Sequence, residues 1–236
     1  GTYMNKLILN SSANNFVYKN LGITYVSPDY ESLSHMITVA KNYNMNYHII
    51  DPNTDSSVGL NPFVFADPVQ TGIAISSVLK GMYVSTKADT MTAYRENVAE
   101  QAIQNVCILL KEMYPRLHDG DLPNLEDLLD YLTDFSLVEK MCKQMEEIPD
   151  LKNKYSIQLR YFKKNFYADG SGNAETEKSV YHATSELDNL LRHPGVKKIL
   201  CNRDTNLIYD NVLRNGDITF VCTRRGDLGA TAHQAF

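Results

Sequence analysis

Residues 47–63, YHIIDPNTDSSVGLNPF, decide the fold that the sequence predicts. They begin with a short apolar run, residues 47–50, which ends at Asp51 and Pro52. Such a run bounded by turn residues is typical of a strand that is buried on both faces, as in a parallel sheet. Because proline cannot continue a central strand, the strand is expected to end where Asp51 places its carboxylate.

Asp51 is a candidate binding residue because of this position. In open parallel sheets, ligands and phosphates usually bind at the carboxyl ends of the strands. Asp51 is therefore predicted to support a phosphate- or magnesium-binding network through water. The same residue also fits a second interpretation, a turn former at the end of a strand.

The segments near both ends of the chain have the strand–helix rhythm of a parallel sheet. Before the deciding stretch, the sequence predicts a helix over 2–16, a strand over 22–26 and a helix over 33–43. After Pro194 and Gly195 it predicts strands over 196–201 and 217–222, a helix or strand over 207–213, and a final helix from about 228–232. The strand over 217–222 carries Arg224 and Arg225 at its carboxyl end.

The middle of the chain has helical periodicity instead. Helices are predicted over 69–82, 94–114, 125–132, 137–148, 151–167 and 176–191. Pro115 and Pro149 are expected to end helices, Asn124 to cap one, and Ser136 with Glu139 to form a capping box. The predicted fold is α/β: a discontinuous sheet domain, residues 1–65 and 195–236, with an all-α helical bundle, residues 66–194, inserted into it.

Composition narrows the function classes. The 236 residues carry a formal net charge of −5, which argues against nucleic-acid binding through the overall field but leaves a local basic loop or the bore of a ring open. No apolar run reaches the roughly 18 residues that span a bilayer, so a soluble piece is expected. Its ends are expected to be cut, because Phe236 follows an apolar-leaning segment without a terminal signal and Gly1 precedes mid-helix sequence. The widely spaced cysteines predict reduced, structural thiols in a cytosolic compartment: Cys107, Cys142, Cys201 and Cys222.

Two groups of cationic residues are candidates for chemistry. Arg224 and Arg225 are arginine-finger candidates, because a guanidinium from a neighbouring subunit can neutralise charge on a transferred phosphoryl group. The alternative is two solvated arginines in a turn. Arg160, Lys163 and Lys164 lie among aromatic residues in RYFKKNFY, a combination that suits single-stranded DNA. On a helix, however, most of those aromatic side chains would be core and the lysines solvated.

Several passages together resemble the conjugative, type IV secretion ATPases of the FtsK/HerA-like P-loop group, and most of all the TraG/TraD-type coupling proteins. They are ITYVSPDYESL, YHIIDPNTDSSVGLNPF, YRENVAEQAIQNVCILLKEMY, LPNLEDLLDYL and DNVLRNGDITFVCTRRGDLG. The resemblance implies a RecA-like domain that binds ATP and Mg²⁺, in a hexamer at the cytoplasmic face of the bacterial membrane. It also implies that the hexamer pumps single-stranded or duplex DNA, recruits relaxase and relaxosome proteins, and contacts the secretion-channel proteins.

Two details qualify what the resemblance implies. Thr2 would be the magnesium-binding hydroxyl of a GxxxxGK[ST] loop, or else a simple helix cap beside Gly1. Ser27-Pro28 stands where the family often has Asp-Pro, and the Walker A and Walker B motifs are incomplete, so the parent protein is expected to be an ATPase and this piece inactive. Two alternatives stay open: the pilus-assembly ATPase of the same machine, and a non-enzymatic helical module that docks relaxase or accessory proteins.

Overall fold

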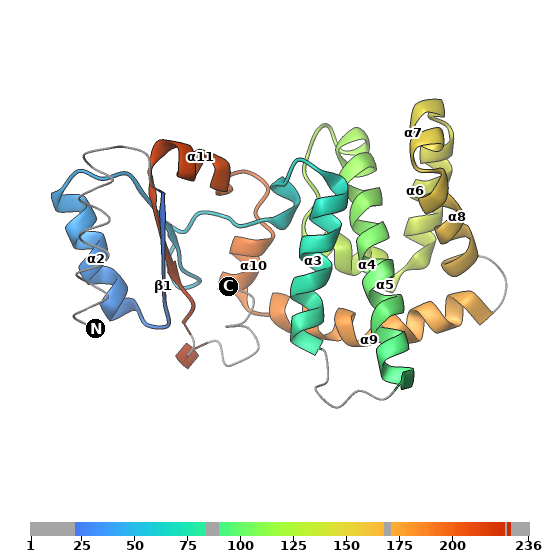
Figure 1. The fold of residues 1–236 in the computed structure, drawn as a ribbon, viewed down its shortest axis with the longest axis horizontal. Coiled ribbons are helices and arrows are strands. Elements are labelled where there is room, and N and C mark those ends of the chain that lie inside the picture. The colour runs from blue at the N-terminus through green and yellow to red at the C-terminus, as the bar shows by residue number, and fades with distance from the viewer. Residues whose placement is uncertain (1–21, 84–89, 168–170, 225, 228–236) are drawn as a thin grey trace. The chain divides into compact units, whose positions relative to one another are not determined.

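The computed structural model describes residues 22–83, 90–167, 171–224 and 226–227 (Figure 1). The chain divides into two compact units, a sheet unit of Gly1–Leu60 with His193–Phe236 and a helical unit of Asn61–Arg192. The sequence placed these boundaries at residues 65/66 and 194/195. The predicted helices over 2–16 and from 228–232 lie outside the described residues, as do Thr2 and Arg225.

The described part of the sheet unit contains a parallel sheet of three strands in the order β1-β3-β2. They are β1 (Ile23–Ser27), β2 (Tyr47–Ile50) and β3 (Ile218–Cys222). Ile218 pairs with Ile23 on one side and with Tyr47 on the other. The chain is therefore an α/β protein, and the segments before and after the helical unit meet in one sheet.

Burial differs between the strands from what the sequence predicted. All five residues of β3 are buried, whereas only Ile50 is buried among the four residues of β2. The difference arises because β3 has a neighbour on each side, while β2 pairs with β3 alone among the described strands. The prediction that residues 47–50 are buried on both faces was therefore wrong. The central strand of the described sheet is β3, not β2.

Helix α2 (Tyr30–Asn42) covers one face of the sheet. It begins three residues earlier than predicted, because the Asp29 carboxylate accepts a hydrogen bond from the Ser32 N–H at 2.8 Å and caps the helix there. Its buried residues pack against alternate residues of β3: Leu33, Met36, Ile37 and Ala40 against Ile218, Phe220 and Cys222. In Figure 1, α2 lies on one side of the strands and α10 and α11 lie on the other.

The predicted strand over 196–201 is wrong, because α10 (Pro194–Leu200) occupies those residues. Proline at the first helical position presets the backbone for a helix, and Val196, Ile199 and Leu200 then share one buried face. The neighbouring ambiguous segment is also a helix, α11 (Tyr209–Asn215), which ends at Gly216 with a positive φ of 69°.

The described residues of the helical unit contain no strand. The elements are η1 (Pro62–Val64), α3 (Pro68–Tyr83), α4 (Thr90–Leu117), α5 (Leu125–Thr133), α6 (Phe135–Glu146), α7 (Pro149–Lys154), α8 (Ser156–Asn165) and α9 (Ser171–Leu191). Helix α4 packs against α3, α5, α6 and α9 and supplies much of the core. None of the described helices is both long enough and apolar enough to cross a membrane.

Several predicted helix boundaries in this unit are wrong. Pro115 does not end α4 but lies inside its last turn. The backbone hydrogen bond that proline cannot donate there is one of the last in the helix, so the turns before it keep theirs. Asp134 rather than Ser136 caps α6, accepting a hydrogen bond from the Ser136 N–H at 2.9 Å. Pro149 begins α7 instead of only ending α6, and the helix predicted over 151–167 is divided at Tyr155 into α7 and α8.

The apolar residues of α3 do not all face the core. Ile75 and Leu79 are buried, whereas Ile73 and Val78 are 49% and 51% exposed. Gly72 explains the difference, because a Cβ there would lie 2.9 Å from the backbone oxygen of Gln104 in α4. The close approach of the two backbones turns the face containing Gly72, Ile75 and Leu79 toward α4.

Candidate functional sites

Asp51 lies directly after β2 and is fully buried. Its carboxylate accepts a hydrogen bond from the Asn53 N–H at 3.0 Å, and its own N–H donates to Ser57 Oγ at 3.0 Å. These contacts close a tight turn at the carboxyl end of the strand. A buried carboxylate needs compensation, because removing its charge from water is costly.

Arg224, two residues after β3, supplies this compensation. Its Nε donates to Asp51 Oδ1 at 2.9 Å and its Nη2 to Oδ2 at 2.8 Å, a bidentate ion pair. The guanidinium lies 4.8 Å from the ring centroid of Tyr30, at the start of α2. The hydrogen bonds to Asp51 raise the pKa of Arg224, so the guanidinium stays charged.

The backbone of Arg224 has an unusual conformation. Its φ is 45°, in the left-handed region that non-glycine residues seldom adopt. A strained backbone persists where surrounding contacts overdetermine it, and here the bidentate pair and the Tyr30 contact do so. Arg224 is therefore held inward, with its side chain only 20% exposed.

Other polar groups gather at the same carboxyl edge of the sheet. Ser27 ends β1, and its carbonyl accepts the N–H of Thr223 at 2.9 Å. The hydroxyl of Thr223 is buried and has no hydrogen-bond partner among the described residues. Burial raises the pKa of the Cys222 thiol, so the thiol stays protonated at neutral pH. The described residues contain no cluster of three His, Cys, Asp or Glu side chains that could hold a metal ion.

Helix α10 positions the loop that follows Asp51. A Cβ on Gly195 would lie 1.9 Å from the carbonyl oxygen of Pro52, so only glycine permits this approach. Lys198 donates to Asp55 at 2.8 Å, and the Leu60 N–H donates to the Ile199 carbonyl at 2.8 Å. The segment predicted as a strand over 196–201 is thus the helix that supports the loop after Asp51.

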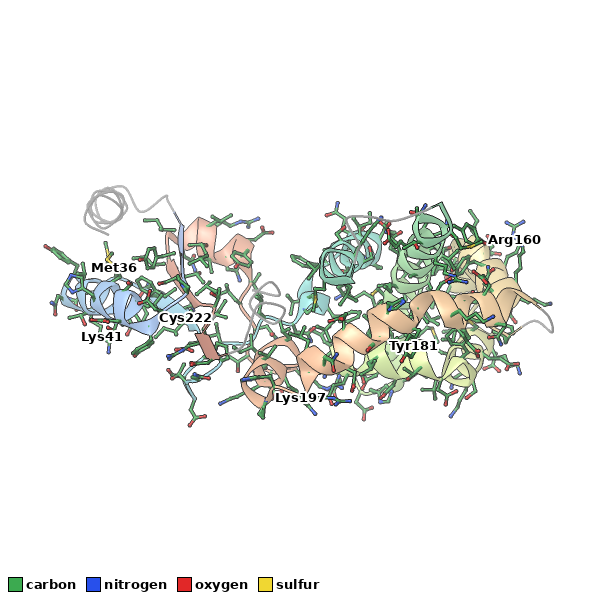
Figure 2. All side chains as sticks on the ribbon, turned by 90° about the horizontal axis from the view of Figure 1, so that it is seen from below. Met36, Lys41, Arg160, Tyr181, Lys197 and Cys222 are labelled. Carbon is green, nitrogen blue, oxygen red and sulfur yellow. The ribbon has the colours of Figure 1, made fainter. Side chains whose placement is uncertain are left out.

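A second candidate site is a groove of about 450 Å³ in the helical unit. It is formed by α4, α8 and α9, and its lining mixes aromatic, apolar, amide and charged side chains: Tyr94, Val98, Gln101, Ile157, Arg160, Tyr161, Lys164, Asn165, Glu175 and Thr176. Two of the three predicted DNA-binding residues, Arg160 and Lys164, are among them, whereas Lys163 is exposed and lies outside the groove. Figure 2 labels Arg160 on this unit and Cys222 on the sheet unit.

The aromatic residues of RYFKKNFY divide between core and groove. Phe162 and Phe166 are buried and their rings lie 5.1 Å apart, as expected for core residues on a helix. Tyr161 is half-buried and lines the groove. The interpretation of core aromatic residues and solvated lysines therefore holds for the two phenylalanines and for both lysines, and the exposed Arg160 and Lys164 also line the groove.

Sequence reasoning found Asp51 and Arg224 separately but did not pair them. It missed Tyr30 and Ser57 at the sheet edge, and Tyr94 and Glu175 in the groove. The turn residues between Asp51 and Gly59 were a usable signal for Ser57. No local pattern indicated the others, because their partners come from distant segments.

No protein-family model matches this chain, and no curated protein matches it. The resemblance to secretion ATPases therefore stays a prediction.

Proposed function

We propose that this chain is part of a hexameric DNA-translocating ATPase, the coupling protein of a conjugative type IV secretion system. One observation carries the proposal: strands from both sides of a helical insertion form a single parallel sheet, with Asp51 and Arg224 paired at its carboxyl edge. This arrangement supports a partial RecA-like domain with an inserted all-α domain. The partners proposed are DNA, relaxosome proteins and the secretion channel.

In this proposal Arg224 acts on the transferred phosphoryl group and Asp51 is a positioning residue. Both carboxylate oxygens of Asp51 accept hydrogen bonds from Arg224, so Asp51 does not fit a direct ligand of Mg²⁺. Asp51 would orient the guanidinium before ATP binds, which lowers the entropy that is lost when the guanidinium is positioned in the transition state. ATP with Mg²⁺ supplies the free energy of translocation.

The test is ATP hydrolysis in the longest natural protein that contains this chain, with and without single-stranded and duplex DNA. Arg224→Lys keeps the charge beside Asp51 but loses the bidentate geometry. An arginine finger contributes on the order of 10³-fold or more to kcat, so a loss of that order is expected with little change in folding.

Arg214→Lys is the matched control, because Arg214 is an exposed residue of α11 on the same unit. Its DNA-stimulated hydrolysis should equal that of the wild type. Absence of DNA-stimulated hydrolysis in the wild type contradicts the translocase, and a fully active Arg224→Lys variant contradicts the role of Arg224.

A second candidate is a non-enzymatic docking module. It is favoured by the groove of the helical unit, where Arg160 and Lys164 line a cavity that a partner can enter. Capture of relaxosome proteins by the chain, without any ATP hydrolysis in the longest natural protein, would support the docking module over the motor.

A further inference from the structure

We propose that the groove between α4, α8 and α9 binds a short acidic peptide segment of a partner protein. The segment would carry one or two carboxylates beside an aromatic or aliphatic side chain. The proposal does not depend on the ATPase assignment, because every residue that carries it belongs to the helical unit.

The charge of the groove selects an acidic ligand. Arg160 and Lys164 lie one helical turn apart on α8 and both line the groove. Neither has an ion-pair partner in the described part of the chain, and α8 contains no acidic residue. Glu175 also lines the groove, but Arg95 lies 3.6 Å from its carboxylate and compensates its charge. Two cations without an ion-pair partner among the described residues therefore face the cavity of a protein whose net charge is −5.

The apolar part of the lining selects a side chain beside the carboxylates. Tyr94 is 53% exposed and Ile157 is 68% exposed, and both border the cavity. Partly exposed aromatic and aliphatic side chains around a pocket are typical anchors for a partner residue. Burial raises the pKa of Tyr161, so its hydroxyl stays protonated and can donate a hydrogen bond.

The amide side chains suit a peptide backbone. Asn165 Nδ2 donates to the carbonyl of Tyr161 at 2.9 Å, which orients the side chain and leaves its Oδ1 to accept a peptide N–H. Gln101, on α4, adds a second amide with one donor and one acceptor function. A chain of alternating N–H and C=O groups can use both.

Single-stranded DNA fits the same groove less well. Its binding sites combine stacking residues with a cationic track that follows the backbone over about four or more nucleotides. Here the cations occupy one turn of one helix, and a carboxylate, Glu175, is part of the lining. The volume of about 450 Å³ is that of a local ligand site. Localised charge beside an apolar anchor favours a peptide.

The experiment selects ligands from a random octapeptide library displayed on phage, against the immobilised full chain. Peptides with one or two acidic residues next to an aromatic or aliphatic residue should be enriched. The best one, labelled with fluorescein, is then titrated and followed by anisotropy. Charge reversal in Arg160→Glu and in Lys164→Glu should each weaken binding by about tenfold or more.

Lys163→Glu is the matched control, because Lys163 is an exposed residue of the same helix that does not line the groove. It should bind the peptide within about twofold of the wild type. Circular dichroism of all three variants should match the wild type, since each substituted side chain is exposed.

Three results would overturn the proposal. The first is a selection that enriches no acidic peptide. The second is an equal loss of affinity in Lys163→Glu, which would indicate attraction by the general charge of α8. The third is tighter binding of a thymidine 20-mer than of the selected peptide, lost in Arg160→Glu and Lys164→Glu, which would assign the groove to nucleic acid.

Discussion

The candidate sites of the two units use their cationic residues in opposite ways. In the sheet unit, Arg224 pairs with the buried Asp51, from which it is separated by 173 positions in the sequence. In the helical unit, Arg160 and Lys164 are exposed and line a groove. The first arrangement stabilises the fold and orients a guanidinium, whereas the second leaves charge available to a ligand. The comparison shows that partners, rather than residue type, decide what an arginine does.

The units also differ in the range of the contacts that stabilise them. In the sheet unit, His48 lies 3.1 Å from Asp217, and this pair too joins the two ends of the chain. In the helical unit, the capping contacts of α5 and α6 join residues two or three positions apart, and a longer-range pair such as Tyr155 and Glu112, 43 positions apart, stays within one continuous segment of chain. The sheet unit therefore forms only after the whole helical unit has been synthesised, because its strands come from both sides of it.

The largest expected effect is on the sheet unit. Arg224→Ala leaves the Asp51 carboxylate buried without a counter-charge, which should cost about 3–5 kcal/mol. Hydrogen exchange followed by mass spectrometry reports each unit separately, so protection should fall in the peptides of β2 and β3 and persist in α5 and α6. Adding Asp51→Asn to Arg224→Ala should restore part of the loss.

Arg214→Ala serves as the control for this prediction, since an exposed residue away from such features should change stability by about 0.5 kcal/mol or less. Equal exchange in Arg224→Ala and in the control would show that the pair is not what stabilises the sheet edge.

A smaller effect is expected in the helical unit. Asn124 caps α5 by accepting hydrogen bonds from the N–H groups of Glu126 and Asp127, and Asp127 completes the capping box. Asn124→Ala should cost about 1 kcal/mol, with urea unfolding followed by circular dichroism as the measurement. Ser136→Ala should cost less, because Asp134 caps α6. A loss of stability in Ser136→Ala larger than that in Asn124→Ala would contradict the assignment of Asp134 as the cap of α6.

The smallest effect depends on pH and concerns Glu112 of α4. Burial raises the pKa of Glu112, but hydrogen bonds from Tyr155 at 2.6 Å and Lys154 at 3.2 Å outweigh it, so the pKa lies below its ordinary value of 4.5. A carboxyl with a lowered pKa stabilises the fold above 4.5, and that stabilisation is lost as the pH falls through the folded-state pKa.

Glu112→Gln should therefore be less stable than the wild type at neutral pH, and the difference should shrink as the pH falls below 4.5. Urea midpoints of both proteins across this range provide the measurement. A difference that grows on acidification would mean that the pKa is raised instead.

The sequence alone determined the elements whose signals are local. The strands at residues 47–50 and 217–222, the helical middle of the chain and the cap at Asn124 follow from alternation, periodicity and turn residues within a few positions of each other. The physical reason is that hydrophobic spacing and capping act over one or two turns of chain. These signals were also strong enough to predict a parallel α/β sheet.

Only the tertiary structure decided what depends on distant segments. It assigned α10 as a helix against the loop after Asp51, made β3 the central strand, paired Asp51 with Arg224, and divided Arg160 and Lys164 from Lys163. Each outcome depends on which surfaces meet in space, and neighbouring residues carry no information about a partner more than a hundred positions away.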